Sequence, residues 1–202
     1  MIVKICGITN REDALAAAEG GATAIGFNFY PCSPRYIHPD QAAAIAQSLP
    51  ASVLRVGVFV NELPREVQRV SKMVPLDVVQ LHGDEPAEQA AHNGRHVWKA
   101  FRVNRDWDPA VLNEYPADAF LLDGPSAGVY GGSGDSFDWT RAQGLTQRII
   151  VAGGLDASNV GKAIREIRPW GVDACSRLEF SPGRKDHQKM RSFLEAALAE
   201  NI

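Results

Sequence analysis

Eight short runs of β-branched and apolar residues recur along the 202-residue chain, and segments with helical spacing separate most of them. The runs are Ile2–Cys6, Ala22–Asn28, Val53–Val60, Asp77–Leu81, His96–Phe101, Ala119–Asp123, Arg148–Ala152 and Gly171–Cys175. Strands joined by helices run parallel, and eight such units close into a barrel, whereas a doubly wound sheet of this size usually carries five or six strands. The pattern therefore predicts an α/β protein, a single (β/α)8 TIM barrel over residues 1–202.

Helical spacing and end signals support this alternation. We expect helices over Arg11–Glu19, Pro39–Leu49, Pro64–Met73, Pro86–Ala91, Ser158–Ile167 and Asp186–Ala199. The connections after the fifth and sixth strands show weaker helical spacing. Asn10 is placed to cap the first helix, Pro64 and Pro86 lie near first-turn positions, and either Asp156 or Ser158 is expected to open the seventh.

Composition excludes several classes of partner. The chain is 45% hydrophobic and 22% charged, and no apolar run is long enough to cross a bilayer, so we expect no membrane insertion. A formal net charge of −3 gives no basic field for nucleic acid, although a few local basic residues suffice to hold one phosphate. A strand-like run follows Met1 at once, which predicts a cytoplasmic protein.

The three cysteines, Cys6, Cys32 and Cys175, form an odd set without close pair spacing. This argues against a disulfide framework and against a Cys-rich zinc site. We expect free thiols and no metal.

In such a barrel the chemistry lies on the loops that follow the strands. Gly153 and Gly154 follow the seventh strand and precede a helix, and glycines let backbone N–H groups approach an anion closely. Ser176 and Arg177 follow the eighth strand, which is the neighbour of the seventh in a closed barrel. These loops predict a phosphate site, although a glycine pair also suits an ordinary tight turn.

Cys6 ends the first strand, and strand alternation places Ile2, Lys4 and Cys6 on the inner face. A buried ammonium at Lys4 would favour the Cys6 thiolate and lower its pKa from about 8.5 towards neutral, as a general base requires. The alternative is that Cys6 is a small buried hydrophobic residue.

Asp123 closes the apolar sixth strand and brings a carboxyl group to the same end of the barrel. Partial burial would favour its protonated form and provide an acid opposite Cys6, but a capping or ion-pairing carboxylate is also consistent with the sequence. A base and an acid beside a phosphate site suit proton transfer on a sugar phosphate.

Three more side chains follow strand ends. Arg35 lies on a long loop where its guanidinium suits bidentate binding of a carboxylate, or it is a surface arginine. Gln80 and His82 end the fourth strand and either bond sugar hydroxyls or serve the structure. The glycine-rich segment 124–134 is predicted to be a mobile flap over the barrel mouth.

Several motifs resemble those of the phosphoribosylanthranilate isomerase family, and they span the whole chain in order. They are Lys4-Ile5-Cys6-Gly7-Ile8-Thr9, Ser33-Pro34-Arg35, Gln80-Leu81-His82-Gly83, Gly131-Gly132-Ser133-Gly134 with Phe137-Asp138-Trp139, and Ala152-Gly153-Gly154-Leu155. One such motif alone would be weak evidence, whereas their joint presence at matching strand ends is highly specific.

The resemblance implies an Amadori rearrangement of N-(5-phosphoribosyl)anthranilate to 1-(2-carboxyphenylamino)-1-deoxyribulose 5-phosphate in tryptophan biosynthesis, without a metal or organic cofactor. It implies Asp123 as general acid, Cys6 as general base and Arg35 as the clamp on the anthranilate carboxylate. Gly153, Gly154 and Ser176 would hold the phosphate.

The eighth loop departs from the family pattern, because Arg177 stands where a glycine is expected and Cys175 where a serine is usual. Arginine at a position that needs positive φ would strain the loop, or its guanidinium would add a phosphate contact. We expect no catalytic role for Cys175.

Two rival functions remain at this stage. A histidine-pathway or dual-specificity aminoaldose isomerase would carry an aspartate in place of Cys6 and a second glycine-pair loop after the third strand, where Phe59-Val60-Asn61-Glu62 stands instead. A non-catalytic barrel that binds a phosphometabolite would need no Cys6, Asp123 and Arg35 together. The sequence is compatible with either a monomer or a homodimer.

Overall fold

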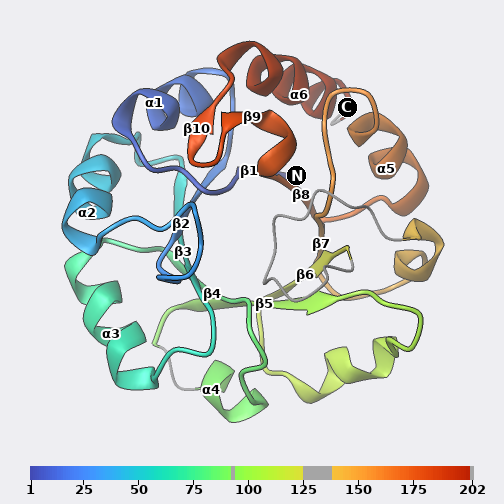
Figure 1. Ribbon diagram of the computed structural model, residues 1–202. Helices are drawn as coiled ribbons and strands as arrows, with labels where there is room; N and C mark the ends of the chain where they lie inside the picture. Colours follow the sequence, from blue (N-terminus) through green and yellow to red (C-terminus); the bar gives the residue numbers. More distant parts are fainter. Residues whose placement is uncertain (92–93, 125–137, 201–202) are drawn as a thin grey trace.

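The computed structural model describes residues 1–91, 94–124 and 138–200 and contains a closed barrel of eight parallel strands in chain order (Figure 1). The (β/α)8 fold is therefore confirmed. The barrel strands are β1 (Ile2–Ile5), β2 (Ala24–Asn28), β3 (Leu54–Phe59), β4 (Val78–Leu81), β5 (His96–Arg102), β6 (Ala119–Asp123), β7 (Ile149–Val151) and β8 (Gly171–Ala174).

Helices surround the barrel (Figure 1). They are α1 (Arg11–Glu19), α2 (Pro39–Ser48), α3 (Pro64–Met73), α4 (Ala87–Ala91), α5 (Val160–Ile167) and α6 (His187–Ala199). Short 3-10 helices at Pro109–Glu114 and Trp139–Ala142 follow β5 and β6, where the helical spacing is weakest. In the described residues no helix is long and apolar enough to span a membrane.

Helix ends follow local side-chain chemistry, with one correction. Asn10 caps α1 by accepting a hydrogen bond from the Asp13 amide, as predicted. The expected cap of the seventh helix by Asp156 or Ser158 is wrong, because α5 begins at Val160 after Asn159. Asp156 instead accepts hydrogen bonds from the Ser158 amide and hydroxyl, which form a local turn before the helix.

Strand alternation divides the core into two layers. Val3 and Ile5 point outward into the larger cluster beneath the helices, whereas Ile2 packs on the smaller cluster inside the barrel. Trp98 is the largest fully buried side chain in that inner cluster. The inner face thus also carries Lys4 and Cys6, as the alternation predicted.

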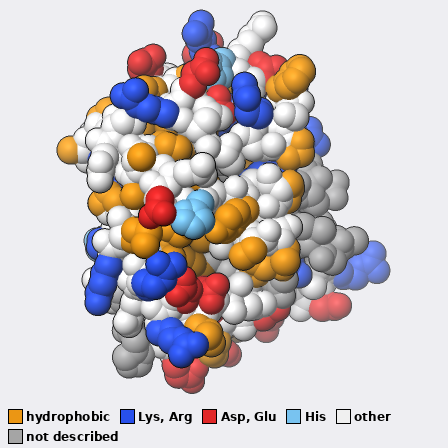
Figure 2. Space-filling model, turned by 60° about the vertical axis from the view of Figure 1, so that its left-hand side comes forward, with side chains coloured by type: hydrophobic (Ala, Val, Ile, Leu, Met, Phe, Trp, Pro, Cys, Tyr) orange, Lys and Arg blue, Asp and Glu red, His pale blue; other side chains and the backbone are white. Residues whose placement is uncertain are grey.

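A two-stranded hairpin that sequence inspection missed follows β8 and lies beside the barrel mouth (Figure 1). It consists of β9 (Glu179–Ser181) and β10 (Arg184–Lys185). On the outer surface, Figure 2 shows hydrophobic side chains interspersed with both acidic and basic ones on the face toward the viewer. The mixed signs agree with a small net charge.

Candidate active site

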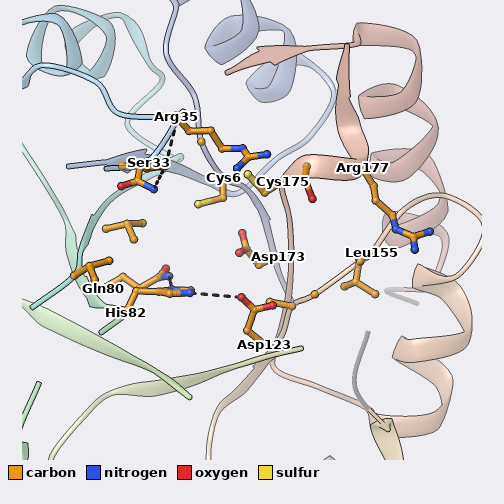
Figure 3. A pocket seen from close by; sticks show the side chains of 18 residues that line it. Cys6, Ser33, Arg35, Gln80, His82, Asp123, Leu155, Asp173, Cys175 and Arg177 are labelled. Carbon is orange, nitrogen blue, oxygen red and sulfur yellow. Dashed lines mark hydrogen bonds and ion pairs between the residues drawn. The ribbon is translucent and has the colours of Figure 1, made fainter. Parts of the chain in front are cut away.

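A cavity at the carboxyl ends of the strands brings together every predicted site residue (Figure 3). Its lining includes Cys6, Arg35, Gln80, His82, Asp123, Gly153, Gly154, Ser176 and Arg177. These residues come from the ends of six different strands or the loops that follow them, so barrel closure alone makes them neighbours.

Cys6 lies above a buried ion pair. Lys4 Nζ lies 2.9 Å from Asp173 Oδ1, and Lys4 also hydrogen-bonds to Cys6. Burial raises the pKa of Asp173 to about 7, although the Lys4 charge acts in the opposite direction. The pKa of Lys4 is raised despite burial by the negative charges of Asp173 and Cys6, so the lysine stays cationic beneath the thiol.

The Cys6 thiol is acidified by its surroundings. A hydrogen bond from Cys175 is the largest cause and lowers the pKa of Cys6 well below its usual value. Burial opposes this effect, while the charges of Lys4 and Lys185 support it. Conversely, donating that hydrogen bond raises the pKa of Cys175. The surroundings therefore favour the thiolate at Cys6 and the protonated thiol at Cys175.

Asp123 faces Cys6 across the cavity, and Asp173 lies between them in the view of Figure 3. One Asp123 oxygen accepts from the Gly124 amide at 2.8 Å, and the other lies 3.5 Å from His82 Nε2. The amide nitrogen of Gln80 lies 2.8 Å from His82 Nδ1. If that amide donates, a neutral His82 carries its proton on Nε2 and directs it toward Asp123.

Arg35 is held from one side. Its Nε and Nη2 atoms bind both carboxylate oxygens of Glu179 at 2.8 to 3.1 Å. Lys185 Nζ also contacts Glu179, at 3.0 Å. This pairing uses the lateral edge of the guanidinium and leaves the Nη1–Nη2 edge with the right geometry for a second carboxylate.

The loop after β7 has a backbone form that lets amide groups approach an anion. Gly153 and Gly154 adopt positive φ values of 83° and 59°, which residues with a Cβ rarely adopt. Arg177 is not among the residues with positive φ, so the alternative of a strained loop is excluded. Its Nη1 lies 3.0 Å from Asp156 Oδ2 at the cavity rim.

Sequence reasoning missed Asp173, Glu179 and Lys185, and it placed Cys175 beside the phosphate loop rather than against Cys6. Asp173 could have been found from the pairing of β1 with β8, because a closed barrel sets Lys4 beside it. The predicted flap, apart from Gly124, lies outside the described residues. Within those residues no group of His, Cys, Asp or Glu side chains is suited to hold a metal ion.

Comparison with known proteins identifies the family of this chain. Residues 3–196 match the family model described as "N-(5'phosphoribosyl)anthranilate (PRA) isomerase". The chain belongs to the phosphoribosylanthranilate isomerase family. The family of enzymes that the motifs resemble is thus confirmed.

Individual relatives of this family cover nearly the whole chain. An N-(5'-phosphoribosyl)anthranilate isomerase of Solibacter usitatus is 56% identical over 200 residues, which are 98% of either protein. The crystal structure of the Thermus thermophilus isomerase superimposes with a TM-score of 0.91 at 40% identity and covers 98% of this chain and 99% of its own. A further isomerase structure, in complex with reduced 1-(o-carboxyphenylamino)-1-deoxyribulose 5-phosphate, gives a TM-score of 0.84 at 41% identity, with 98% and 100% covered.

Proposed function

We propose that this chain converts N-(5-phosphoribosyl)anthranilate to 1-(2-carboxyphenylamino)-1-deoxyribulose 5-phosphate, with Cys6 as general base and Asp123 as general acid. The observation that carries the proposal is the acidified Cys6 thiol facing the Asp123 carboxyl across one cavity. The ligand in the 41% identical relative is a reduced form of that product, which supports the choice of substrate.

The first step opens the sugar ring. Asp123 gives a proton to the furanose ring oxygen, and the bond from C1 to that oxygen breaks as the anthranilate nitrogen supplies its electron pair. A protonated Schiff base and a free hydroxyl result. The contact with His82 and the hydrogen bond from the Gly124 amide hold the carboxyl group in one orientation for this transfer.

The second step uses the thiolate. Cys6 removes the proton from C2, the electrons move toward the nitrogen, and an enolamine forms, which tautomerises to the ketose. The lowered pKa of Cys6 favours the thiolate, which is the form that can accept this proton. Both steps couple proton transfers to electron shifts within the substrate, where C2 is oxidised as C1 is reduced, so the mechanism calls for no external oxidant or reductant.

The remaining groups bind the two ends of the substrate. The Nη1–Nη2 edge of Arg35 would grip the anthranilate carboxylate while Glu179 fixes the other edge. Gly153, Gly154, Ser176 and Arg177 would hold the phosphate. The side-chain oxygen of Gln80 is buried and has no partner in the described residues, which suits a hydrogen bond from a sugar hydroxyl.

Turnover of freshly generated phosphoribosylanthranilate, followed by loss of anthranilate-type fluorescence, tests the proposal. The wild type should turn over, whereas Cys6→Ser and Asp123→Ala should each lower kcat by at least about a hundredfold, because each removes a proton-transfer group. Cys32→Ser is the matched control, since that thiol is exposed. Wild-type protein that binds the reduced product but shows no turnover would refute the assignment.

The assembly state is a second part of the proposal. The 42% identical isomerase of Thermotoga maritima is described as dimeric, and we infer a homodimer for this chain as well. Light scattering of the purified protein measures the mass directly. A mass of one chain at micromolar concentration would contradict the inference without affecting the assigned reaction.

A further inference from the structure

Two thiols end neighbouring strands at the place where the barrel closes. Strand β1 pairs in parallel with β8, with Ile5 opposite Ala174, and the Cys6 amide donates to the Ala174 carbonyl at 2.9 Å. Cys6 and Cys175 are the residues that follow Ile5 and Ala174 at the ends of these two strands. Both line the same cavity, and their side chains lie next to each other in Figure 3.

The backbone spacing suits a covalent link between these thiols. Neighbouring strands lie about 4.8 Å apart, and the Cα atoms of disulfide-bonded cysteines are usually about 4.4 to 6.8 Å apart. Two glycines leave room for the sulfur atoms. A Cβ at Gly26 would fall 2.7 Å from Cys6 Sγ, and one at Gly7 would fall 2.9 Å from Cys175 Sγ.

The charges around the pair favour an attacking and a resolving thiol. The surroundings favour the thiolate of Cys6, which is the form that attacks an oxidant. Cys175 keeps its proton, and its sulfur lies 3.8 Å from Lys185 Nζ and 4.0 Å from Glu179 Oε1. A nearby cation and a nearby proton acceptor are what the second thiol needs when it in turn reacts.

We infer that Cys6 and Cys175 form a peroxide-sensitive thiol pair that closes reversibly to a disulfide and thereby switches off the site. In the first step the Cys6 thiolate attacks hydrogen peroxide, the O–O bond breaks, and protonation of the released hydroxide leaves a sulfenic acid and water. In the second step Cys175 sulfur attacks the sulfenic sulfur, and the hydroxyl group leaves as water with the Cys175 proton. Peroxide gains the two electrons that the thiols lose.

The loss of activity rests on the proposed function, since the disulfide occupies the sulfur that would take the C2 proton. The covalent link itself does not rest on it. Reduction by a dithiol such as dithiothreitol breaks the disulfide, restores both thiols and returns the base. A sulfinic acid on Cys6, in contrast, would not be reversed by a dithiol.

The experiment treats the full chain with a graded excess of hydrogen peroxide and reads two signals. Trypsin without reduction should release peptides 5–11 and 166–177 joined and lacking two hydrogens, because trypsin does not cut the bond before Pro169. Isomerase turnover should fall in parallel, and dithiothreitol should restore most of it. Cys32→Ser should behave as the wild type, because Cys32 is exposed and lies outside the cavity.

Cys175→Ser is the decisive variant, because its hydroxyl still donates a hydrogen bond beside Cys6 but cannot resolve a sulfenic acid. Its Cys6 should gain two oxygens, and the fraction of turnover that dithiothreitol recovers should be about tenfold smaller than in the wild type. Equal recovery in both proteins, or wild-type Cys6 carrying two oxygens without a linked peptide, would overturn the inference. A linked peptide in a chain without isomerase turnover would support the thiol pair and refute only the proposed function.

Discussion

Lys4 and Asp173, the two charged side chains beneath Cys6, are both buried, and they have opposite effects on the pKa of Cys6. Lys4 and Asp173 are both inside the barrel, and their separation of 2.9 Å means that each compensates the burial of the other. The thiolate is a third charge in the same cluster and gains from Lys4 only what Asp173 leaves uncompensated. The ion pair therefore modulates the basicity of Cys6, although the hydrogen bond from Cys175 remains the largest cause of the lowered pKa.

Substituting Lys4 and substituting Asp173 should shift the pKa of Cys6 in opposite directions. Lys4→Met removes a positive charge and should raise the pKa of Cys6, so the acidic limb of kcat/KM should move about one pH unit higher. Asp173→Asn removes the negative charge that Asp173 carries only above its pKa of about 7, and it should move the limb lower by less than one unit. The pH dependence of Cys6 alkylation by iodoacetamide, in a Cys32→Ser background, reports the same ionisation without turnover. A shift of both variants in one direction would contradict this charge balance.

At the residue scale the sequence predicts groups that stand at strand ends and misses groups that depend on closure. Cys6 and Asp123 end apolar runs, so alternation alone directs them to the mouth. Glu179 follows β8 by five residues and meets Arg35 only because the hairpin folds back over the mouth. The sequence therefore suggests Arg35 as a candidate anion clamp, but it does not reveal that Glu179 fixes one edge of its guanidinium.

At the element scale, β5 anchors two of the loops that form the mouth. Lys99 lies on its outward face and donates to the Gly83 carbonyl at 2.7 Å and to Glu85 at 3.0 Å. Glu85 in turn accepts hydrogen bonds from the amides of Asn61 and Gly83. The loops after β3 and β4, including the segment that carries His82, are thus tied to one buried ion pair.

Lys99→Met should lower the free energy of unfolding by about 3 kcal/mol, because it leaves the Glu85 carboxylate buried without its cation. Lys162→Met is the matched control, since Lys162 pairs with Glu166 on an exposed helix surface, where such pairs contribute less than about 0.5 kcal/mol. Urea unfolding at neutral pH measures both. Equal midpoints for the two variants would show that the Lys99 pair does not anchor the loops.

Element types follow from periodicity more reliably than element ends. The helices Arg11–Glu19 and Pro64–Met73 and the strand Ala119–Asp123 have the predicted bounds, whereas β7 is one residue shorter at each end than its apolar run. A strand ends where the neighbouring strands stop pairing with it, so its ends depend on those neighbours and not on its own sequence alone. The β9–β10 hairpin has only five residues in strands, and its Phe180 is exposed, so no alternating pattern marks it.

At the scale of the whole molecule, the fold depends on β1 and β8 meeting, because the first and last strands have no chain connection to each other. Ile2 pairs with Gly171 at the start of this seam, and the ladder runs from there to Ile5 and Ala174. A Cβ on Gly171 would lie 2.7 Å from Ile2 Cβ and 2.9 Å from the Ile2 carbonyl oxygen. The absence of a side chain at Gly171 is what allows the two strands to approach.

Gly171→Ala should therefore lower the free energy of unfolding by about 2 kcal/mol, since the backbone of one strand must move. Gly161→Ala provides the control with the same chemical change. Gly161 lies in α5, and a Cβ there meets only the flexible ends of Glu200 and Arg165. Alanine in a helix is favoured over glycine by about 0.5 to 1 kcal/mol, so this variant should be slightly more stable. Urea midpoints that move in opposite directions would support the seam at Gly171 as the tight point of barrel closure, whereas a neutral Gly171→Ala would show that β1 and β8 can separate without cost.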